Sequence, residues 1–342
     1  MTRLFRSALA ASVLLLAGAA GRTLSAQGMR YGVYVELADS LHGSLDEITA
    51  TLRPALAAGD WQVVAVHDVG VDRQACGYAA RVLVLHNERY ARDVLAHGPR
   101  AAFALPMRLF LFQDEDGTHL AAVNGYSINR TIIAESGFEG PTDAAMQDIT
   151  RLAAGVLQGS FVPRQYGQLR TRGYIGRTMG IMAGGPFAEK IELVRSAAGS
   201  SPQDVRRVAA QLADGLRRQA GRGRWQLRPI YQIDLAAQGV VVLGVSGAAL
   251  ESRAIAIVGA GGNESRSAFR CPGLDHAGAF PIEVVVWADS GQVRVGVVDE
   301  MYRMKLFFED AGKMRFAQNM RMPGSVEGEL KDLLRPEAES RP

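Results

Sequence analysis

The sequence predicts an α+β protein made of two tandem repeat units, and two observations carry this prediction. The first is a hairpin that occurs twice, at 104–124 and at 279–298. In each copy a proline opens a mostly apolar run, an acidic turn ending in glycine follows, and a second alternating strand returns. The second observation is a set of helical stripes around these hairpins. Strands joined by hairpins, with helices gathered around them, are typical of an α+β fold rather than of a doubly wound parallel sheet.

The two units are related by a shift in the sequence that grows along the chain. Val205 follows Leu45 by 160 residues at the start of a shared helical stripe, and Pro281 follows Pro106 by 175 residues at the hairpins. Insertions into the loops of a duplicated domain would produce such a growing shift. The stripe residues are Leu45, Ile48, Leu52 and Leu56 in the first unit and Val205, Val208, Leu212 and Leu216 in the second.

Both units are expected to follow one order of elements: strand, helix, two strands, short helix, hairpin and closing helix. In the first unit, Ser44 and Glu47 form a capping box at a helix start, and Pro54 should bend or shorten that helix. In the second, Ser201 caps the corresponding helix and Pro202 takes its first position. The expected elements outside the hairpins are strand 30–38, a helix from 45 to 59, strands 61–67 and 80–86, helices 88–96 and 141–157, a helix from 202, strand 239–245, a helix from 248 and helix 324–334.

Composition and charge are those of an ordinary globular protein with room for two domains. The chain has 342 residues, 48% of them hydrophobic and 21% charged, and its formal net charge is +3. Such a small and scattered basic excess does not indicate a polyanion, so no nucleic-acid partner is expected.

The first 26 residues have the pattern of a secretory signal peptide. Arg3 and Arg6 supply the charged start, an apolar stretch follows from 8 to 20, and Leu24-Ser-Ala26 is a cleavage site of small residues. The apolar stretch is short for a membrane span, although an uncleaved anchor helix is the alternative. We therefore expect a mature protein without an integral membrane segment, either periplasmic or secreted.

The expected division of the chain is signal peptide 1–26, first repeat domain 27–158, linker 159–186, second repeat domain 187–336 and tail 337–342. The linker holds seven glycines, four arginines and no acid. One interpretation is a basic loop that binds an anion or a membrane surface. The other is an interdomain linker, part of which pairs with a sheet edge.

Cys76 and Cys271 are the only cysteines. In an oxidising compartment they could form one disulfide that ties the two halves of the chain together. The alternative is two unrelated thiols, because the sequence does not give the Cα separation that a bridge requires.

No catalytic or cofactor motif is complete. The stretch from Val258 to Glu264 lacks the last glycine of a dinucleotide fingerprint. Gly244-Val-Ser246-Gly247 is one residue short of a nucleophile elbow, so Ser246 is interpreted as a turn residue. The sequence therefore favours a non-catalytic protein and indicates no particular cofactor.

Both faces of each hairpin are largely apolar. In the first, Arg108, Phe110 and Phe112 alternate with Met107 and its apolar neighbours, so both sides of the strand need cover. One face must meet the helices of its own unit. The other, which would expose Phe110, Phe112 and Trp287, must meet the second unit, an oligomer partner or an apolar ligand.

Several of these segments look like the bacterial family catalogued as domain of unknown function 302. The resemblance lies in the helix stripe, a glycine–tryptophan entry to the next strand, Leu85-His-Asn-Glu-Arg-Tyr90 before a short helix, and Ala104-Leu-Pro106 at the hairpin. It covers about 30–157, and more loosely 187–335. It implies curved, mainly antiparallel sheets with helices on one face, similar to the TATA-binding protein, and often dimers. A tandem copy would then be a covalent pseudo-dimer. The family has no agreed functional residues.

This chain departs from the family at two positions. Many members have Cys-Asn-Pro where His86-Asn-Glu88 stands and a cysteine where Met107 stands; the second unit has Ser246 and Ile282 there. If the third strand and the hairpin are neighbours, as the family fold implies, His86 and Met107 could lie close together. Imidazole and thioether ligands suit copper or haem iron.

His67 is the nearest candidate for a third ligand of such a metal site. The alternative is that His86 caps a strand end and that Met107 fills core space. The leading function prediction is an exported, non-catalytic binding or interaction protein whose repeats associate with each other, or with further copies, and which could bind a small ligand. The rival is a metal- or haem-binding redox accessory, or a small-molecule enzyme, using the first unit.

Overall fold

The computed structural model describes residues 30–133, 138–171, 185–259, 271 and 273–335. The predicted signal peptide and tail lie outside the described residues. The α+β class is confirmed, because the chain forms two antiparallel sheets with helices packed against them. None of the described helices is both long and apolar enough to cross a membrane.

The first unit contains a six-stranded sheet in which all neighbours are antiparallel. Its strands are, in spatial order, β3 (Gln62–Asp68), β4 (Ala80–His86), β5 (Met107–Asp114), β6 (Gly117–Val123), β2 (Tyr34–Leu41) and β7 (Arg164–Tyr166). A separate pair, β1 (Arg30–Tyr31) with β8 (Arg170–Thr171), is also antiparallel. The single strand expected at 30–38 is therefore two strands.

The second unit contains a five-stranded antiparallel sheet. Its strands are, in spatial order, β10 (Arg228–Leu235), β11 (Val240–Ser246), β12 (Ile282–Asp289), β13 (Gln292–Val298) and β9 (Ile191–Ala198). Apart from the extra edge strand β7, the two sheets have the same strand order and the same connections. This identity of topology is consistent with two repeats.

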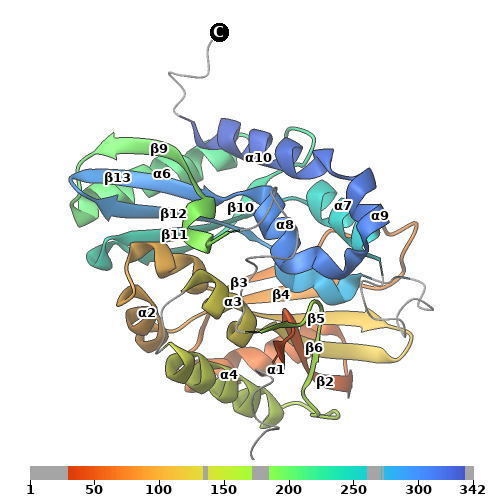
Figure 1. Ribbon diagram of the computed structural model, residues 1–342. Helices are drawn as coiled ribbons and strands as arrows, with labels where there is room; N and C mark the ends of the chain where they lie inside the picture. Colours follow the sequence, from red (N-terminus) through yellow and green to blue (C-terminus); the bar gives the residue numbers. More distant parts are fainter. Residues whose placement is uncertain (1–29, 134–137, 172–184, 260–270, 272, 336–342) are drawn as a thin grey trace, which may run out of the picture.

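The helices of each unit lie mainly on the outer face of its sheet. Figure 1 shows α4 at the lower edge of the molecule and α10 at its upper edge, with the strands of the two sheets between them. α1 packs against β3 and α4, and α6 packs against β10, β11, β12 and β13. The bounds in the first unit are α1 (Leu45–Ala58), α2 (Glu88–Leu95), α3 (Gly125–Ile132) and α4 (Glu139–Ala154). Those in the second are α6 (Pro202–Arg218), α7 (Ala248–Val258), α8 (Glu300–Phe308), α9 (Lys313–Gln318) and α10 (Arg321–Leu334).

Two helix starts match the sequence, and Pro54 does not shorten its helix. The capping boxes at Ser44 and Ser201 are both present. Pro54, however, lies inside α1, which continues to Ala58. The burial of Leu52 and Leu56 on either side of the proline holds the helix together despite the backbone hydrogen bond that proline cannot make.

The described chain also contains five short 3₁₀ helices, and η1 and η5 among them join the two units face to face. They are η1 (Pro99–Ala104), η2 (Phe187–Lys190), η3 (Ala236–Gln238), η5 (Leu274–Ala279) and η6 (Glu309–Ala311). η1 of the first unit lies against β11 and β12 of the second, and η5 of the second lies against β4, β5 and β6 of the first. A Cβ atom on Gly278 would come within 2.5 Å of the Phe110 ring, so η5 rests directly on Phe110.

The two cysteines form a disulfide between the units. Cys76 and Cys271 are bridged, with a Cα–Cα distance of 5.3 Å. The bridge closes a loop of the chain with a sequence separation of 195 residues. Part of the predicted linker is also ordered against the first unit, since β7 pairs with the edge strand β2.

Candidate functional site

A well-formed hollow of the described surface lies in the first unit, between α4 and the β2–β7 edge of the sheet. Its volume is about 490 Å³, within the range of small-molecule sites. It is lined by Val35, Leu37, Asn124, Tyr126, Met146, Gln147, Thr150, Arg151, Ala154, Phe161, Pro163 and Gln165. We call it the α4 cavity.

Strand alternation explains why β2 offers an apolar wall to this cavity. The Tyr34 hydroxyl donates to the Phe307 carbonyl of the second unit at 3.1 Å, so the neighbouring Val35 must point the other way, toward α4. Gln165 is the register partner of Val35 and therefore shares its face. On α4, Met146, Thr150 and Ala154 are spaced four residues apart and form one stripe toward the sheet.

Most polar atoms near the cavity already have partners. The Gln165 side-chain oxygen accepts from the backbone N–H of Gly32 at 2.7 Å and from the Asn124 side-chain nitrogen at 3.2 Å. The Tyr126 hydroxyl is bonded to Asp143, and burial together with this bond raises the pKa of Tyr126. The cavity is thus largely apolar inside, with its polar side chains held in place around it.

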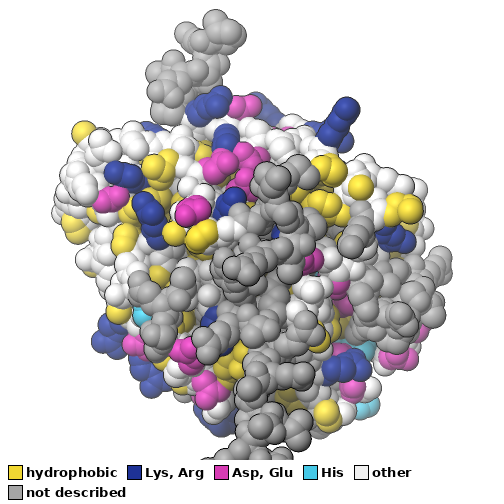
Figure 2. All heavy atoms as spheres, in the orientation of Figure 1, with side chains coloured by type: hydrophobic (Ala, Val, Ile, Leu, Met, Phe, Trp, Pro, Cys, Tyr) yellow, Lys and Arg dark blue, Asp and Glu magenta, His cyan; other side chains and the backbone are white. Residues whose placement is uncertain are grey.

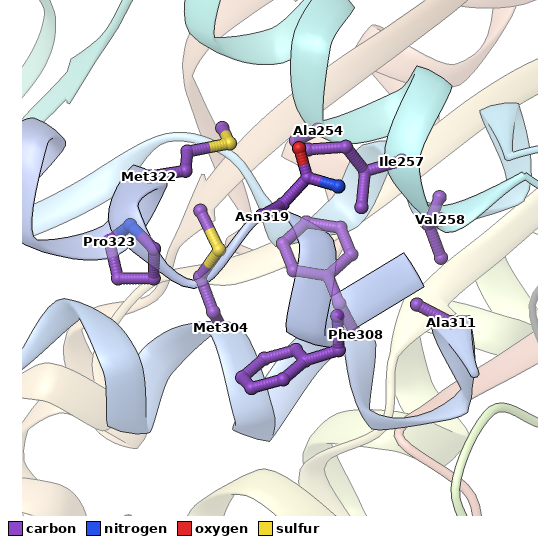
Figure 3. A pocket seen from close by; sticks show the side chains of 10 residues that line it. Ala254, Ile257, Val258, Met304, Phe308, Ala311, Asn319, Met322 and Pro323 are labelled. Atoms are coloured by element: carbon purple, nitrogen blue, oxygen red, sulfur yellow. The ribbon is translucent and has the colours of Figure 1, made fainter. Parts of the chain in front are cut away.

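Two other hollows are less suited to a ligand. One, shown in Figure 3, lies among α7 to α10, where Met304, Phe308 and Met322 gather around a volume of only about 20 Å³; that is little more than room for one water molecule. The other, of about 180 Å³, lies beside the Cys76–Cys271 bridge.

The family comparison concerns the same unit. Residues 38–155 match the model of the family described as "Domain of unknown function DUF302". Residues 38–155 form a DUF302 domain. The crystal structure of an uncharacterised conserved DUF302 protein from Bacillus stearothermophilus is also similar, at 12% identity and a TM-score of 0.30, covering 36% of this chain and 96% of that one. No curated protein matches the chain.

The α4 cavity extends beyond the DUF302 domain. Val35 and Leu37 precede the matched residues, while Phe161, Pro163 and Gln165 follow them. Segments that flank the DUF302 domain therefore supply a large part of the cavity wall.

Where the DUF302 domain meets the second unit, a buried ion pair joins the two hairpins. Arg108 of β5 is 4% exposed and Glu283 of β12 is 6% exposed; an Nη1 atom lies 3.1 Å from Oε1. This contact lacks the alignment of a hydrogen bond, and Nη1 donates instead to the Pro281 carbonyl at 3.1 Å. Burial raises the pKa of Glu283 despite the opposing effect of Arg108 and Arg303.

Arg108 and Glu283 hold equivalent places in the two sheets. Arg108 pairs with Val84 of β4, and Glu283 pairs with Gly244, the corresponding position of β11. Each also stands two residues after its hairpin proline. Equivalent positions that touch each other lie on a two-fold axis in a symmetric dimer.

A second polar group ties β3 of the DUF302 domain to α7. His67 Nε2 lies 2.5 Å from Glu251 Oε1, and the Gly70 N–H donates to Glu251 Oε2 at 2.5 Å. The Ser246 hydroxyl donates to the same carboxylate. All three side chains are buried, so the group connects the units rather than facing a substrate, and Ser246 is the last residue of β11 rather than a turn residue.

Two buried histidines are each held between carboxylates. His119 Nδ1 lies 2.6 Å from Glu36 and Nε2 lies 2.8 Å from Asp114. Burial alone would lower the pKa of His119, but the bonds to Asp114 and Glu36 outweigh it and raise the pKa to about 9. In the same way, burial would lower the pKa of His276, yet Asp310 and Asp275 raise it to about 10.

The proposed His86–Met107 metal pair is wrong in its register. Leu85 is the partner of Met107 on β5, so these two share a face and His86 points to the opposite one. His67 pairs with Val82, four residues before His86 along β4, or roughly 13 Å away at strand spacing. The three side chains therefore do not form a metal site. His86 Nε2 lies 3.3 Å from Glu88 instead.

The aromatic residues expected to need cover are buried by protein. Phe110 lies under η5 of the second unit, and Phe112 stacks on His119 with ring centroids 4.7 Å apart. Trp287 is close to Gly296, where a Cβ atom would come within 2.8 Å of its ring. None of the three hollows described above is lined by these aromatic side chains.

Among the described residues, one acidic group is close enough to hold a metal ion. Glu192, Asp299 and Glu327 each place an oxygen within 4.8 Å of the others. Lys331, however, is bonded to both glutamates, so its ammonium group already neutralises part of their charge.

None of the α4 cavity residues is predicted from the sequence. The local signal that could have found them is the stripe of Met146, Thr150 and Ala154. A helix face that packs on a sheet is usually lined by large apolar residues, whereas this stripe includes a polar and a small one.

Proposed function

We propose that this chain is an exported, non-catalytic binding protein whose first unit takes a small, largely apolar molecule into the α4 cavity. The observation that carries the proposal is the cavity itself, with about 490 Å³ of space and walls formed mainly by aliphatic and aromatic side chains. Sites for small molecules are usually concave, mostly apolar and furnished with a few placed polar groups.

In this proposal the second unit acts as a covalent partner that covers the inner face of the first. The shared topology, the contact of η1 and η5 with opposite sheets, and the Arg108–Glu283 pair support a covalent pseudo-dimer. A true homodimer would place two identical charges at this position. A duplicated chain can place opposite charges there, which favours pairing within one chain.

Filling the cavity should abolish binding. Ala154→Phe places a ring in the α4 cavity, and we expect it to weaken binding of the neutral fluorescent probe N-phenyl-1-naphthylamine tenfold or more, measured by fluorescence titration. Ala144→Phe, on an exposed face of the same helix, is the matched control and should bind as the wild type does. Absence of saturable binding to the wild type, or equal binding by Ala154→Phe, would contradict the proposal.

Export is proposed from the signal-like residues 1–26, and the Cys76–Cys271 bridge supports it because disulfides persist in oxidising compartments. We expect the protein isolated from the producing cell to begin near Gln27, directly after Ala26. N-terminal sequencing of that protein measures this. An intact Met1 on the folded, soluble protein would show that the segment is not removed.

A further inference from the structure

The charge around the α4 cavity is one-sided. Arg151 is the one charged residue among the described residues that line it, and no acidic side chain does so. A neutral ligand could at most accept a hydrogen bond from this guanidinium group, whereas an anionic group on the ligand would gain a stronger ionic contact with it.

The polar and apolar parts of the cavity lining are separated along α4. Gln147 and Arg151, four residues apart, form an exposed stripe. Met146 and Thr150 form the neighbouring, more buried stripe, opposite Val35 of β2. A ligand that satisfies both stripes has a polar group at the mouth and an apolar body inside.

Arg151 has hydrogen-bonding capacity to spare. Its side chain is 68% exposed and donates through Nη2 to Asp148. The other oxygen of Asp148 accepts from the Trp61 ring nitrogen at 2.8 Å, so this carboxylate is anchored on both sides. An arginine has five N–H donors in a planar fork, which matches the two oxygens of a carboxylate.

Resting on the proposed function of the α4 cavity, we infer that its ligand is an amphiphilic carboxylate, with a hydrocarbon body against Val35, Leu37 and Phe161 and its carboxylate at Arg151. The exposed Val162, 71% accessible between the lining residues Phe161 and Pro163, extends the apolar surface to the rim. A hydrocarbon chain longer than the cavity could lie over it.

The test compares laurate with dodecanol, which share a chain length and differ in the head group. Each is titrated as a competitor against N-phenyl-1-naphthylamine bound to the complete mature protein, with fluorescence as the readout and at concentrations below micelle formation. We expect laurate to bind at least tenfold more tightly to the wild type than to Arg151→Gln, and dodecanol to bind both alike. Arg53→Gln, at an exposed position of α1, is the matched control and should leave both affinities unchanged. Added salt should weaken the binding of laurate and leave the binding of dodecanol unchanged.

The outcomes separate this inference from the proposed function. If laurate binds the wild type and Arg151→Gln equally while the neutral probe still binds, the carboxylate assignment is overturned and the cavity remains a binding site. If neither the probe nor either amphiphile binds, both proposals fail.

Discussion

Reversing one charge of the buried Arg108–Glu283 pair is expected to destabilise the protein more than any surface substitution would. In Arg108→Glu, two carboxylates would face each other at a site where both positions are almost fully buried. Breaking a buried pair leaves an uncompensated charge, which typically costs about 3–5 kcal/mol of unfolding free energy. The loss should appear as a lower midpoint of urea denaturation, measured by tryptophan fluorescence.

The double variant Arg108→Glu with Glu283→Arg is the informative control. It restores opposite charges at the two equivalent positions, so it should be more stable than either single variant, with a coupling energy that a double-mutant cycle measures. Recovery will be partial, because the arginine at 108 also donates to the Pro281 carbonyl. If the two losses simply add in the double variant, the charge pair does not hold the units together.

The features that the sequence predicted well are those with short-range causes. Strand β4 has the expected bounds, and the capping box at Ser44 and the cap at Ser201 both formed. Alternation and capping depend on residues only a few positions apart. The same reasoning missed α3 and α8, although Asn124 and Asp299 cap these helices directly after a strand and could have signalled them.

The strand register and the α4 cavity could not be predicted from the sequence, because both depend on residues that lie far apart in the chain. Whether His86 faces Met107 depends on how β4 aligns with β5, and a shift of one residue turns every side chain to the other face. The α4 cavity depends on β7 adding to the edge of β2, which brings Gln165 opposite Val35 from 130 positions away. The sequence allowed part of the linker to pair with a sheet edge, but no local pattern identifies β2 as that edge.

Stability is expected to fall as the pH rises from about 6.5 to 9.5. The folded-state pKa values of His119 and His276, about 9 and about 10, are raised above the value near 6.5 of an unfolded histidine. A raised pKa stabilises the fold fully below the unfolded value and loses that contribution as the pH passes the folded value. Each histidine should therefore lose on the order of 3 kcal/mol across this window.

Few other types of side chain change their protonation state strongly between about pH 6.5 and 9.5. Aspartates and glutamates of the unfolded chain are ionised throughout this window, and tyrosines, whose ordinary pKa is about 10, are still mostly protonated at its upper end. Urea denaturation at half-unit steps of pH measures the unfolding free energy. His119→Gln removes one of the two cationic rings but can keep one hydrogen bond to Glu36 or Asp114. Its unfolding free energy should therefore be lower than that of the wild type at pH 6.5 and should fall less steeply as the pH rises. His42→Gln, at an exposed histidine, should give a curve parallel to the wild type. Equal slopes for wild type and His119→Gln would mean that His119 is not held as an imidazolium between Glu36 and Asp114.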